Sequence, residues 1–288
     1  MSGEHPVELA VIIPCHNEEA TLSQQLDALT GQSFDGAWEV VVVDNASTDA
    51  TAEVARRYAD RGVRVVSADG GRGIAYARNR GVEATTARSV VFCDGDDVVS
   101  AGWVAAMGAA LREHPFVTGT VDSGLLNPPD VAASRPSHSK DRLPTFGSIP
   151  FGRGNNSGLH RNVWLEAGGY DEAFPGLEDM ELSLRLAARG IQPVLVPAAV
   201  VHYRYRASAG DLWRQGLFYG RGRPVMAKTA RELGLPGPSR FEGLRSWGWL
   251  LVHLPSLRTH TGRLQLLWIF ANRMGVLRGA VSDRVLHV

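Results

Sequence analysis

The sequence predicts an α/β fold in which a mainly parallel mixed sheet is followed by a helical C-terminal segment. Short runs of Val and Ile alternate with helical patterns through residues 1–121, and such runs are typical of strands buried on both faces. From residue 206 the pattern is helical, without strand-like runs. Alternating strands and helices imply right-handed crossovers, which place ligands at the carboxyl ends of the strands.

The expected elements follow one another along the chain. Strands are expected at 9–13, 39–43, 63–67 and 89–93, and helices at 21–29, around Val54 and Tyr58, and at 74–83 and 101–112. The alternation weakens after Val121, and the Pro-, Ser- and Asn-rich stretch 122–150 is expected to be a long loop. Helices at 163–167 and 178–189 and strands at 194–196 and 198–203 follow. The remainder is expected to be helical, with a break at 236–238.

Composition and cysteine usage indicate the class of protein. The 288 residues are 44% hydrophobic and 21% charged, which excludes a wholly disordered chain, and two cysteines cannot form a disulfide framework. No apolar run near Met1 resembles a signal peptide, and none elsewhere approaches the roughly 20 residues of a membrane-spanning helix. We therefore expect a cytoplasmic protein.

The formal net charge of zero hides two oppositely charged parts. Residues 1–203 hold 16 basic and 26 acidic side chains, whereas residues 204–288 hold 14 basic and 4 acidic ones. An acidic body is a poor surface for nucleic acid, so no nucleic-acid partner is expected. A basic C-terminal part favours an anionic partner.

Three carboxylates follow the fourth expected strand, in the run Asp94-Gly95-Asp96-Asp97. Hard oxygen ligands at a strand end suit magnesium or manganese, which bind through one or two carboxylates plus substrate phosphates. Close carboxylates repel one another unless a cation or hydrogen-bond donors compensate. The alternative is a solvated turn, because Asp and Gly are common turn residues.

Other polar residues lie at the ends of expected elements. Asp44 ends a strand and either accepts a hydrogen bond from a nucleotide or caps the next helix. His202 also ends a strand and is either a structural histidine or a nitrogen ligand facing the Asp cluster. Glu178 and Asp179 open a helix, where a carboxylate is either a cap or a general base.

Six motifs occur together and in a fixed order between residue 8 and about residue 205. They are VIIPCHNEE at 11–19, VDNASTDAT at 43–51, ARNRG at 77–81, CDGDD at 93–97, GGYDEAF at 168–174 and EDMEL at 178–182. In this order they resemble the family 2 glycosyltransferases. The resemblance implies a GT-A fold, a nucleotide-sugar donor with UDP as the expected nucleotide, a divalent metal (Mn or Mg) and inversion at the anomeric carbon.

The resemblance implies a role for each matching residue. Asp179 matches the catalytic base and Asp96 the metal ligand, and His202 matches a histidine that completes the metal site in some relatives. Asp44 matches a residue that pairs with the base, and Arg78 one beside the base and phosphates. The other residues implied in nucleotide-sugar binding are Pro14, Asn17, Glu18, Asp94, Gly95 and Glu178.

The same resemblance divides the chain and narrows the reaction. Residues 1–205 are expected to form the catalytic domain, with a nucleotide-binding half at 1–121 and an acceptor-side half at 122–205, and residues 206–288 a basic helical extension. The Gln-x-x-Arg-Trp signature of processive synthases is absent, so single transfers are expected. The acceptor, whether a glycan, a lipid-linked sugar or a small molecule, is not identified by the sequence.

Two other functions fit parts of the sequence. A sugar nucleotidyltransferase typically uses lysines for the triphosphate, but this chain has only Lys140 and Lys228, both outside the Gly-rich region. A non-catalytic glycan-binding or nucleotide-sugar-binding module would lose the acids, yet Asp96 and Asp179 are both present. A glycosyltransferase, of the hexosyltransferase type, is the leading interpretation.

The basic extension has two open interpretations. In the first, the extension docks on an anionic membrane face or holds a negatively charged acceptor. In the second, its apolar stripe packs on the catalytic domain or on a second subunit of a homo-oligomer. The stripe consists of Leu267, Phe270, Met274, Leu277 and Val281. The aromatic residues that favour a membrane headgroup zone are Tyr203, Tyr205, Trp213, Phe218 and Tyr219.

Overall fold

The computed structural model describes residues 7–135, 141–174, 176–206, 208–238 and 242–282. In these residues, eight strands form one mixed sheet in the order β3-β2-β1-β4-β9-β6-β10-β5. The strands are β1 (Leu9–Cys15), β2 (Trp38–Asp44), β3 (Val63–Ser67), β4 (Ser89–Phe92), β5 (Val98–Val99), β6 (Phe116–Asp122), β9 (Ser157–His160) and β10 (Val194–His202). Strands β3, β2, β1 and β4 are mutually parallel, as expected.

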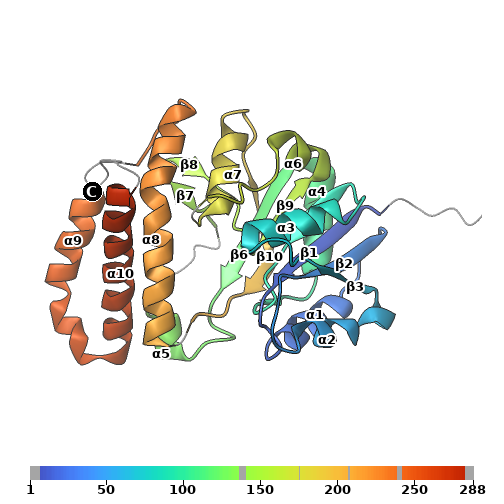
Figure 1. The fold of residues 1–288 in the computed structure, drawn as a ribbon, viewed down its shortest axis with the longest axis horizontal. Helices are drawn as coiled ribbons and strands as arrows, with labels where there is room; N and C mark the ends of the chain where they lie inside the picture. Colours follow the sequence, from blue (N-terminus) through green and yellow to red (C-terminus); the bar gives the residue numbers. More distant parts are fainter. Residues whose placement is uncertain (1–6, 136–140, 175, 207, 239–241, 283–288) are drawn as a thin grey trace, which may run out of the picture.

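Helices cover both faces of this sheet (Figure 1). They are α1 (Leu22–Thr30), α2 (Thr51–Arg56), α3 (Ile74–Glu83), α4 (Trp103–Glu113), α6 (Arg161–Ala167) and α7 (Glu178–Ala187), and a 3-10 turn spans Ala59–Arg61. Successive residues of β1 point to opposite layers, because Val11 and Ile13 pack with the layer of α1 and α4, whereas Ile12 packs with the layer of α3 and α6. The continuous apolar run is therefore buried on both sides, and the α/β prediction is confirmed.

Three strands in the second half of the sheet, β9, β6 and the two-residue β5, were not predicted. β9 runs antiparallel between β4 and β6, and β6 pairs in parallel with β10. The strands expected at 194–196 and 198–203 form one strand, β10, whose register shifts between Val196 and Val200, on either side of Pro197. Residues 122–150 contain only short elements where described: α5 (Pro129–Ala132), β7 (Thr145–Phe146) and β8 (Ile149–Pro150).

Three helices complete the described chain: α8 (Ala209–Glu232), α9 (Glu242–Val252) and α10 (His260–Ser282). A 3-10 turn at Leu254–Arg258 joins α9 to α10. Figure 1 shows α8 beside the α/β body and α9 farthest from it. Small residues bring α8 and α10 into backbone contact, since a Cβ on Gly220 would lie 2.1 Å from the carbonyl oxygen of Asn272. None of these helices combines the length and the apolar character that crossing a bilayer requires, and neither does any other described helix.

The apolar stripe of α10 packs only in part. Leu267 packs with a buried cluster that includes Tyr205 and Leu264, and the ring of Phe270 lies 5.9 Å from that of Trp213. Leu277 and Val281 remain 36% and 80% exposed, whereas small residues such as Ala271 and Gly275 are buried against α8. The two interpretations of the exposed part, contact with a membrane and contact with a second subunit, both stay predictions.

Candidate active site

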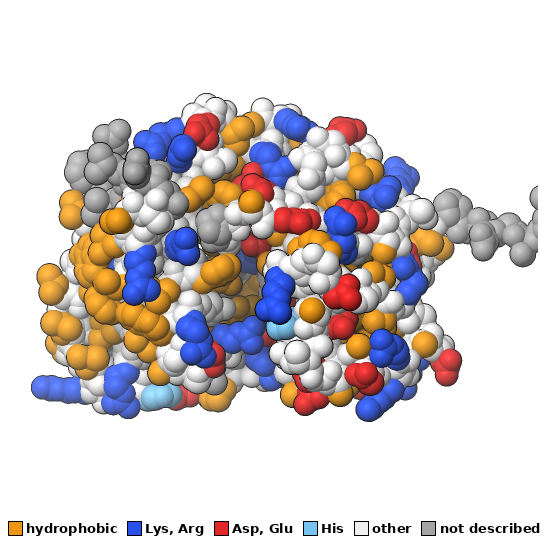
Figure 2. Space-filling view, in the orientation of Figure 1, with side chains coloured by type: hydrophobic (Ala, Val, Ile, Leu, Met, Phe, Trp, Pro, Cys, Tyr) orange, Lys and Arg blue, Asp and Glu red, His pale blue; other side chains and the backbone are white. Residues whose placement is uncertain are grey.

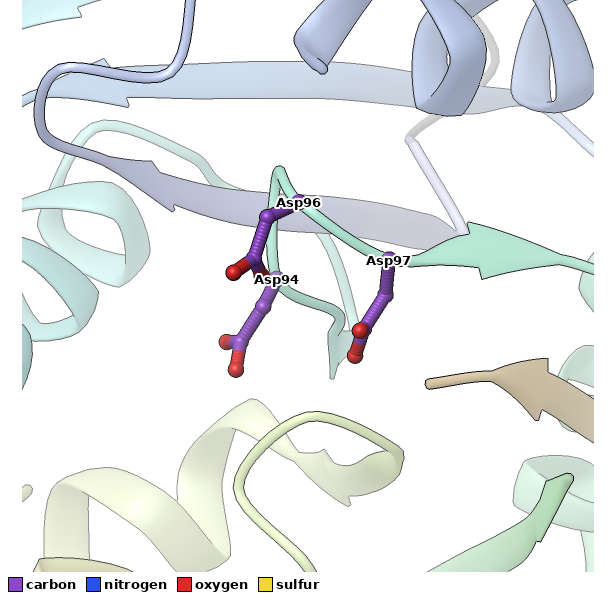
Figure 3. Close-up of side chains that lie close together, drawn as sticks. All are labelled: Asp94, Asp96 and Asp97. Carbon is purple, nitrogen blue, oxygen red and sulfur yellow. The ribbon is translucent and has the colours of Figure 1, made fainter. Parts of the chain in front are cut away.

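The acidic cluster lies in a turn after β4, at the carboxyl edge of the sheet. One ligand atom from each of Asp94, Asp96 and Asp97 lies within 4.8 Å of the others, and the three carboxylates point to the same side of the loop (Figure 3). Burial, reinforced by the neighbouring carboxylates, raises the pKa of Asp96 and of Asp97. The turn therefore concentrates negative charge that a cation would stabilise.

Hydrogen-bond donors offset part of this charge. Arg206 forms an ion pair with Asp96, its Nη2 lying 3.2 Å from Oδ2. Asp97, which is fully buried, accepts hydrogen bonds from the Asn155 side chain at 2.8 Å and from the backbone N–H of Arg204 at 2.9 Å. Asp97 is thereby committed to holding the turn, whereas Asp96 faces the cavity-lining Arg206.

Glu18, from the loop after β1, adds a fourth carboxylate. Its Oε2 is buried without a hydrogen-bond partner among the described residues, and burial together with Asp96 and Asp94 raises its pKa to about 9. A Cβ on Gly95 would lie 2.0 Å from this oxygen, so only glycine admits the close approach. An unpartnered carboxylate oxygen beside three aspartates is a donor set that fits a hard divalent cation such as Mg²⁺ or Mn²⁺.

His202 ends β10, as expected, but its Nδ1 lies 2.9 Å from Oδ2 of Asp122. The clustered ligand atoms found among the described residues are those of the three aspartates and do not include His202. Its role as a metal ligand stays a prediction.

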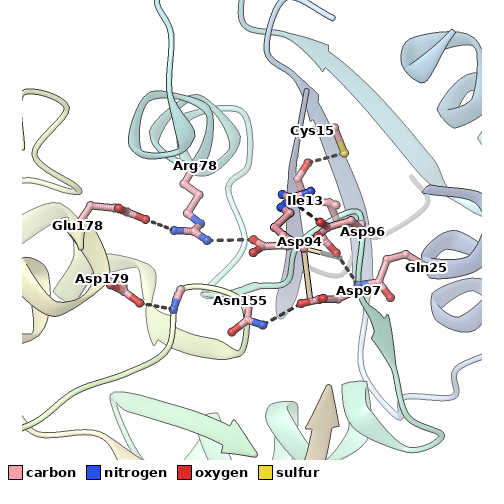
Figure 4. Close-up of polar contacts among 12 residues, drawn as sticks. Ile13, Cys15, Gln25, Arg78, Asp94, Asp96, Asp97, Asn155, Glu178 and Asp179 are labelled. Atoms are coloured by element: carbon pink, nitrogen blue, oxygen red, sulfur yellow. Dashed lines mark hydrogen bonds and ion pairs between the residues drawn. The ribbon is translucent and has the colours of Figure 1, made fainter. Parts of the chain in front are cut away.

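Arg78, on α3, joins the acidic turn to the start of α7 (Figure 4). Its side chain is 2% exposed and donates to Oε1 of Glu178 at 2.6 Å and to Oδ1 of Asp94 at 3.0 Å. Burial lowers the pKa of Arg78, but the surrounding carboxylates outweigh it and raise the pKa overall. The guanidinium therefore stays charged and fixes two carboxylates from distant parts of the chain.

Asp179 is the second residue of α7, which follows Leu177 in a left-handed conformation with φ of 67°. Its Oδ2 accepts a hydrogen bond from the backbone N–H of Gly154 at 2.9 Å, and its Oδ1 accepts one from the N–H of Met180 at 2.8 Å. Burial raises the pKa of Asp179. An oriented carboxylate with a raised pKa is suited to accepting a proton.

A cavity of about 610 Å³ connects these groups. One part of its lining is formed by Arg78, Asp94, Glu178 and Asp179, and another by aromatic side chains of α8, α10 and the segment after β10. A second cavity of about 200 Å³ is lined by Pro14, Glu18 and Gly73 among others, and Ile74 lines both. Figure 2 shows the molecular surface hollowed near its centre.

Three expected nucleotide-binding residues, Asn17, Asp44 and Gly95, line neither of these two cavities. Asn17, with φ of 57°, accepts a hydrogen bond from the backbone N–H of Thr48 at 2.8 Å and so ties the loops after β1 and β2 together. Asp44 accepts a hydrogen bond from the N–H of Ser47 at 3.3 Å, a local turn contact. Their roles at the nucleotide stay predictions.

Several residues of the site were missed by sequence reasoning. Asn155 and the N–H of Gly154 come from a segment between the expected loop at 122–150 and the expected helix at 163–167, to which no element was assigned. Its run of Gly and Asn (152–158) is a signal for close-packed polar backbone. Four aromatic residues expected to favour a membrane headgroup zone line the large cavity: Tyr203, Tyr205, Phe218 and Tyr219. Tyr205 is 8% exposed, whereas Phe218 is 50% exposed, so the membrane role of this set stays a prediction.

Comparisons with known proteins agree with this geometry. Residues 10–166 match the model of glycosyl transferase family 2. Validoxylamine A glucosyltransferase from Streptomyces hygroscopicus subsp. limoneus is 33% identical over 230 residues, covering 65% of this chain and 49% of the relative. Succinoglycan biosynthesis protein ExoA from Rhizobium meliloti is 26% identical over 229 residues, covering 74% and 68%. The chain thus spans about half the length of the first of these relatives.

Solved structures show the same fold. The mannosyltransferase PcManGT from Pyrobaculum calidifontis, in complex with GDP-Man and Mn²⁺, matches with a TM-score of 0.60 and 22% identity, covering 95% of this chain and 88% of that one. TarS 1-349 from S. aureus, in complex with UDP-GlcNAc, matches with a TM-score of 0.55 and 15% identity, covering 98% and 93%. The family model covers more than half of the chain, so the protein belongs to glycosyl transferase family 2 and has the GT-A fold.

Proposed function

We propose that the protein transfers a sugar from a nucleotide-diphosphate sugar, with UDP as the expected nucleotide, to an acceptor hydroxyl with inversion of configuration. The observation that carries the proposal is that Asp94 of the acidic turn and the buried Asp179 line one cavity and are linked through Arg78 and Glu178. Membership of family 2 supports the proposal, as does the likeness to validoxylamine A glucosyltransferase.

The donor is assigned to the acidic edge of the sheet. The nucleoside part occupies the smaller cavity beside Pro14 and Glu18, and Ile74 marks where that cavity meets the larger one. Asp96, with Asp94 beside it, would hold a Mn²⁺ or Mg²⁺ ion, which when bound neutralises charge on the diphosphate leaving group. Arg206, paired with Asp96, supplies a further positive charge there.

Asp179 acts as the base. It removes the proton from the acceptor hydroxyl as that oxygen forms a bond to the anomeric carbon, while the bond from that carbon to the diphosphate oxygen breaks. The hydrogen bonds from Gly154 and Met180 orient the carboxylate for this step. One displacement from the face opposite the leaving group inverts the configuration.

A panel of nucleotide sugars tests this function. The purified protein is incubated with UDP-, GDP- and TDP-sugars, with and without Mn²⁺, and nucleotide release and thermal shift are measured. We expect at least one nucleotide sugar to raise Tm and to be hydrolysed slowly in a metal-dependent way. Binding of none, or formation of a nucleotide sugar from a nucleoside triphosphate and a sugar phosphate, would contradict the assignment.

We further propose that the extension at 206–288 completes the wall of the active-site cavity of the catalytic domain at 1–205 and docks that domain on an anionic bilayer. Residues 243–282 contain no Asp or Glu. Exposed apolar residues gather there beside the exposed Arg245, Arg258, Arg263 and Arg278; they include Leu244, Leu251, Val252, Leu254, Leu257 and Val281. Figure 2 shows apolar side chains over α9 and α10 on the face that also carries the hollow. A basic rim around an apolar patch complements an anionic headgroup layer.

Vesicle flotation tests this docking. The full chain should float with vesicles containing phosphatidylglycerol but not with phosphatidylcholine alone, and salt should weaken the binding. The double variant Leu251→Glu with Val252→Glu, at residues 70% and 74% exposed, should abolish flotation, whereas the control Leu125→Glu, 64% exposed on the catalytic body, should not. No flotation at low salt, or a dimer in size exclusion that the double variant dissociates, would assign the patch to a second copy of the chain.

A further inference from the structure

Two arginines in the large cavity have no carboxylate partner among the described residues. Arg135 is 8% exposed, its Nη1 donates to Oγ of Ser134 at 3.1 Å, and Arg153 donates through Nη1 to the carbonyl oxygen of Gly119 at 3.3 Å. The other two arginines of this lining, Arg78 and Arg206, form ion pairs with carboxylates of the site. Among the described residues, neither guanidinium has an ion-pair partner, although the charge of Asp179 acts on Arg153.

Arg135 is held in a fixed orientation. Its guanidinium carbon lies 4.6 Å from the ring centroid of Trp268 and 5.2 Å from that of Tyr205. Cation–π contacts offset part of the cost of burial, but they leave hydrogen-bond donors of the planar fork available. Burial lowers the pKa of both Arg135 and Arg153, and at Arg153 the charge of Asp179 opposes this effect in part. A buried cation without a partner is unfavourable unless a ligand supplies the anion.

The position of these groups separates them from the donor. Arg153 immediately precedes Gly154, whose N–H orients Asp179. Arg135 packs on Trp268 of α10. The acidic turn is paired instead with Arg78 and Arg206. The aromatic rings of Phe218 and Tyr219 line the same cavity and offer flat faces for a hydroxylated ring. Arg135 thus belongs to the side of the cavity formed with the C-terminal helices, and Arg153 lies next to the loop that orients Asp179.

We infer that this side of the cavity binds an acceptor that carries an oxyanion, a phosphate or a carboxylate, which Arg135 and Arg153 recognise next to the hydroxylated ring. The inference rests on the proposed function, because it takes Asp179 as the base that faces the acceptor. It assigns Arg135 to acceptor specificity, a role separate from the donor contacts of Arg206. A guanidinium fork matches either oxyanion with two parallel hydrogen bonds.

Calorimetric binding with paired probes tests the inference. UDP and Mn²⁺ are kept saturating to block the donor site, and the probes are hexoses compared with their 1- and 6-phosphates and with the matching uronic acids. We expect at least one anionic probe to bind about tenfold or more tightly than its neutral parent. Octyl phosphate and octyl hexosyl phosphate form a second arm. Tighter binding of these octyl compounds than of the soluble phosphates would identify a lipid-linked source for the same oxyanion.

Two variants place the selectivity at Arg135. Arg135→Met keeps an apolar stem beside Trp268 and should lose about tenfold or more in affinity for the anionic probe. The affinity for UDP should stay within twofold of that of the unchanged protein. Removing a buried charge relieves a cost of folding, so Tm should not fall. Arg135→Lys keeps the charge without the fork and should show an intermediate loss. The control Arg214→Met, at an exposed residue of α8 paired with Asp211, should change neither affinity.

The binding measurements can overturn the inference in three ways. Equal binding of neutral and anionic probes to the unchanged protein, or no binding of any anionic probe, would overturn it without use of a variant. It would also be overturned if Arg135→Met weakened UDP as much as the probe, since Arg135 would then serve the donor. Failure of the proposed function has a different signature, because UDP and nucleotide sugars would not bind the unchanged protein at all.

Discussion

Removal of Arg78 should destabilise the fold as well as the site. In Arg78→Met, the carboxylates of Glu178 and Asp94, whose side chains are only 11% and 22% exposed, lose their shared cation. Breaking a buried ion pair by deleting one partner costs about 3–5 kcal/mol, because an uncompensated charge is left behind. At about 2–4 °C per kcal/mol for a large domain, Tm should fall by roughly 6–20 °C.

Urea unfolding at several pH values measures this effect. The loss should be larger at pH 8 than at pH 5, because without Arg78 the pKa of Glu178, already raised by burial, rises further and the folded protein resists its ionisation. Adding Glu178→Gln should recover part of the loss, and the control Arg80→Met, at a residue 37% exposed on the same helix, should cost less than about 1 kcal/mol. A loss for Arg78→Met no larger than that of the control would refute the reasoning.

Three further predictions concern the acidic edge and the base. Asp96→Asn should weaken UDP binding in Mn²⁺ and lower turnover, and a chelator should mimic it in the unchanged protein; full activity in excess chelator would contradict the metal assignment. Gly95→Ala should destabilise by about 1–3 kcal/mol in urea unfolding, because its Cβ would meet Oε2 of Glu18 at 2.0 Å, whereas the control Gly124→Ala, whose nearest contact is 3.6 Å, should not. In a pH–rate profile, kcat/KM should rise with pH and its acidic midpoint should exceed 3.8, the ordinary aspartate pKa, because burial raises the pKa of Asp179; a midpoint at or below 3.8 would argue against this base.

The first half of the fold could be predicted because its strands carry their own signal. Residues of β1 and β2 are apolar and buried on both faces, and each strand is followed by a helix. β9 carries no such signal, since Ser157 and Gly158 are not residues that favour strands. Its strand conformation comes from antiparallel pairing with β4 and β6, a long-range interaction that a local pattern does not contain.

The site divides in the same way. Asp94, Asp96 and Asp179 could be predicted because they occupy element ends, which the topology gathers at one edge of the sheet. Arg206 and the aromatic wall could not, since their positions depend on how the C-terminal helices pack against the α/β body. Asn155 could not either, because its loop is placed by the long-range pairing of β9 with β4 and β6. The basic character of the extension indicated an anionic partner but not where that partner binds. The packing of Trp268 against Arg135 is what turns this part of the extension toward the cavity.

The Asp179→Asn variant tests the central claim most directly. The amide keeps the size of the side chain and can still accept the hydrogen bond from Gly154, but it cannot remove a proton from an acceptor hydroxyl. With a nucleotide sugar identified in the panel, steady-state transfer and donor affinity are measured on the same preparation. We predict that kcat falls by about a thousandfold or more while the Kd of the donor changes less than twofold. Near-normal turnover in Asp179→Asn would contradict the assignment of this carboxylate as the base.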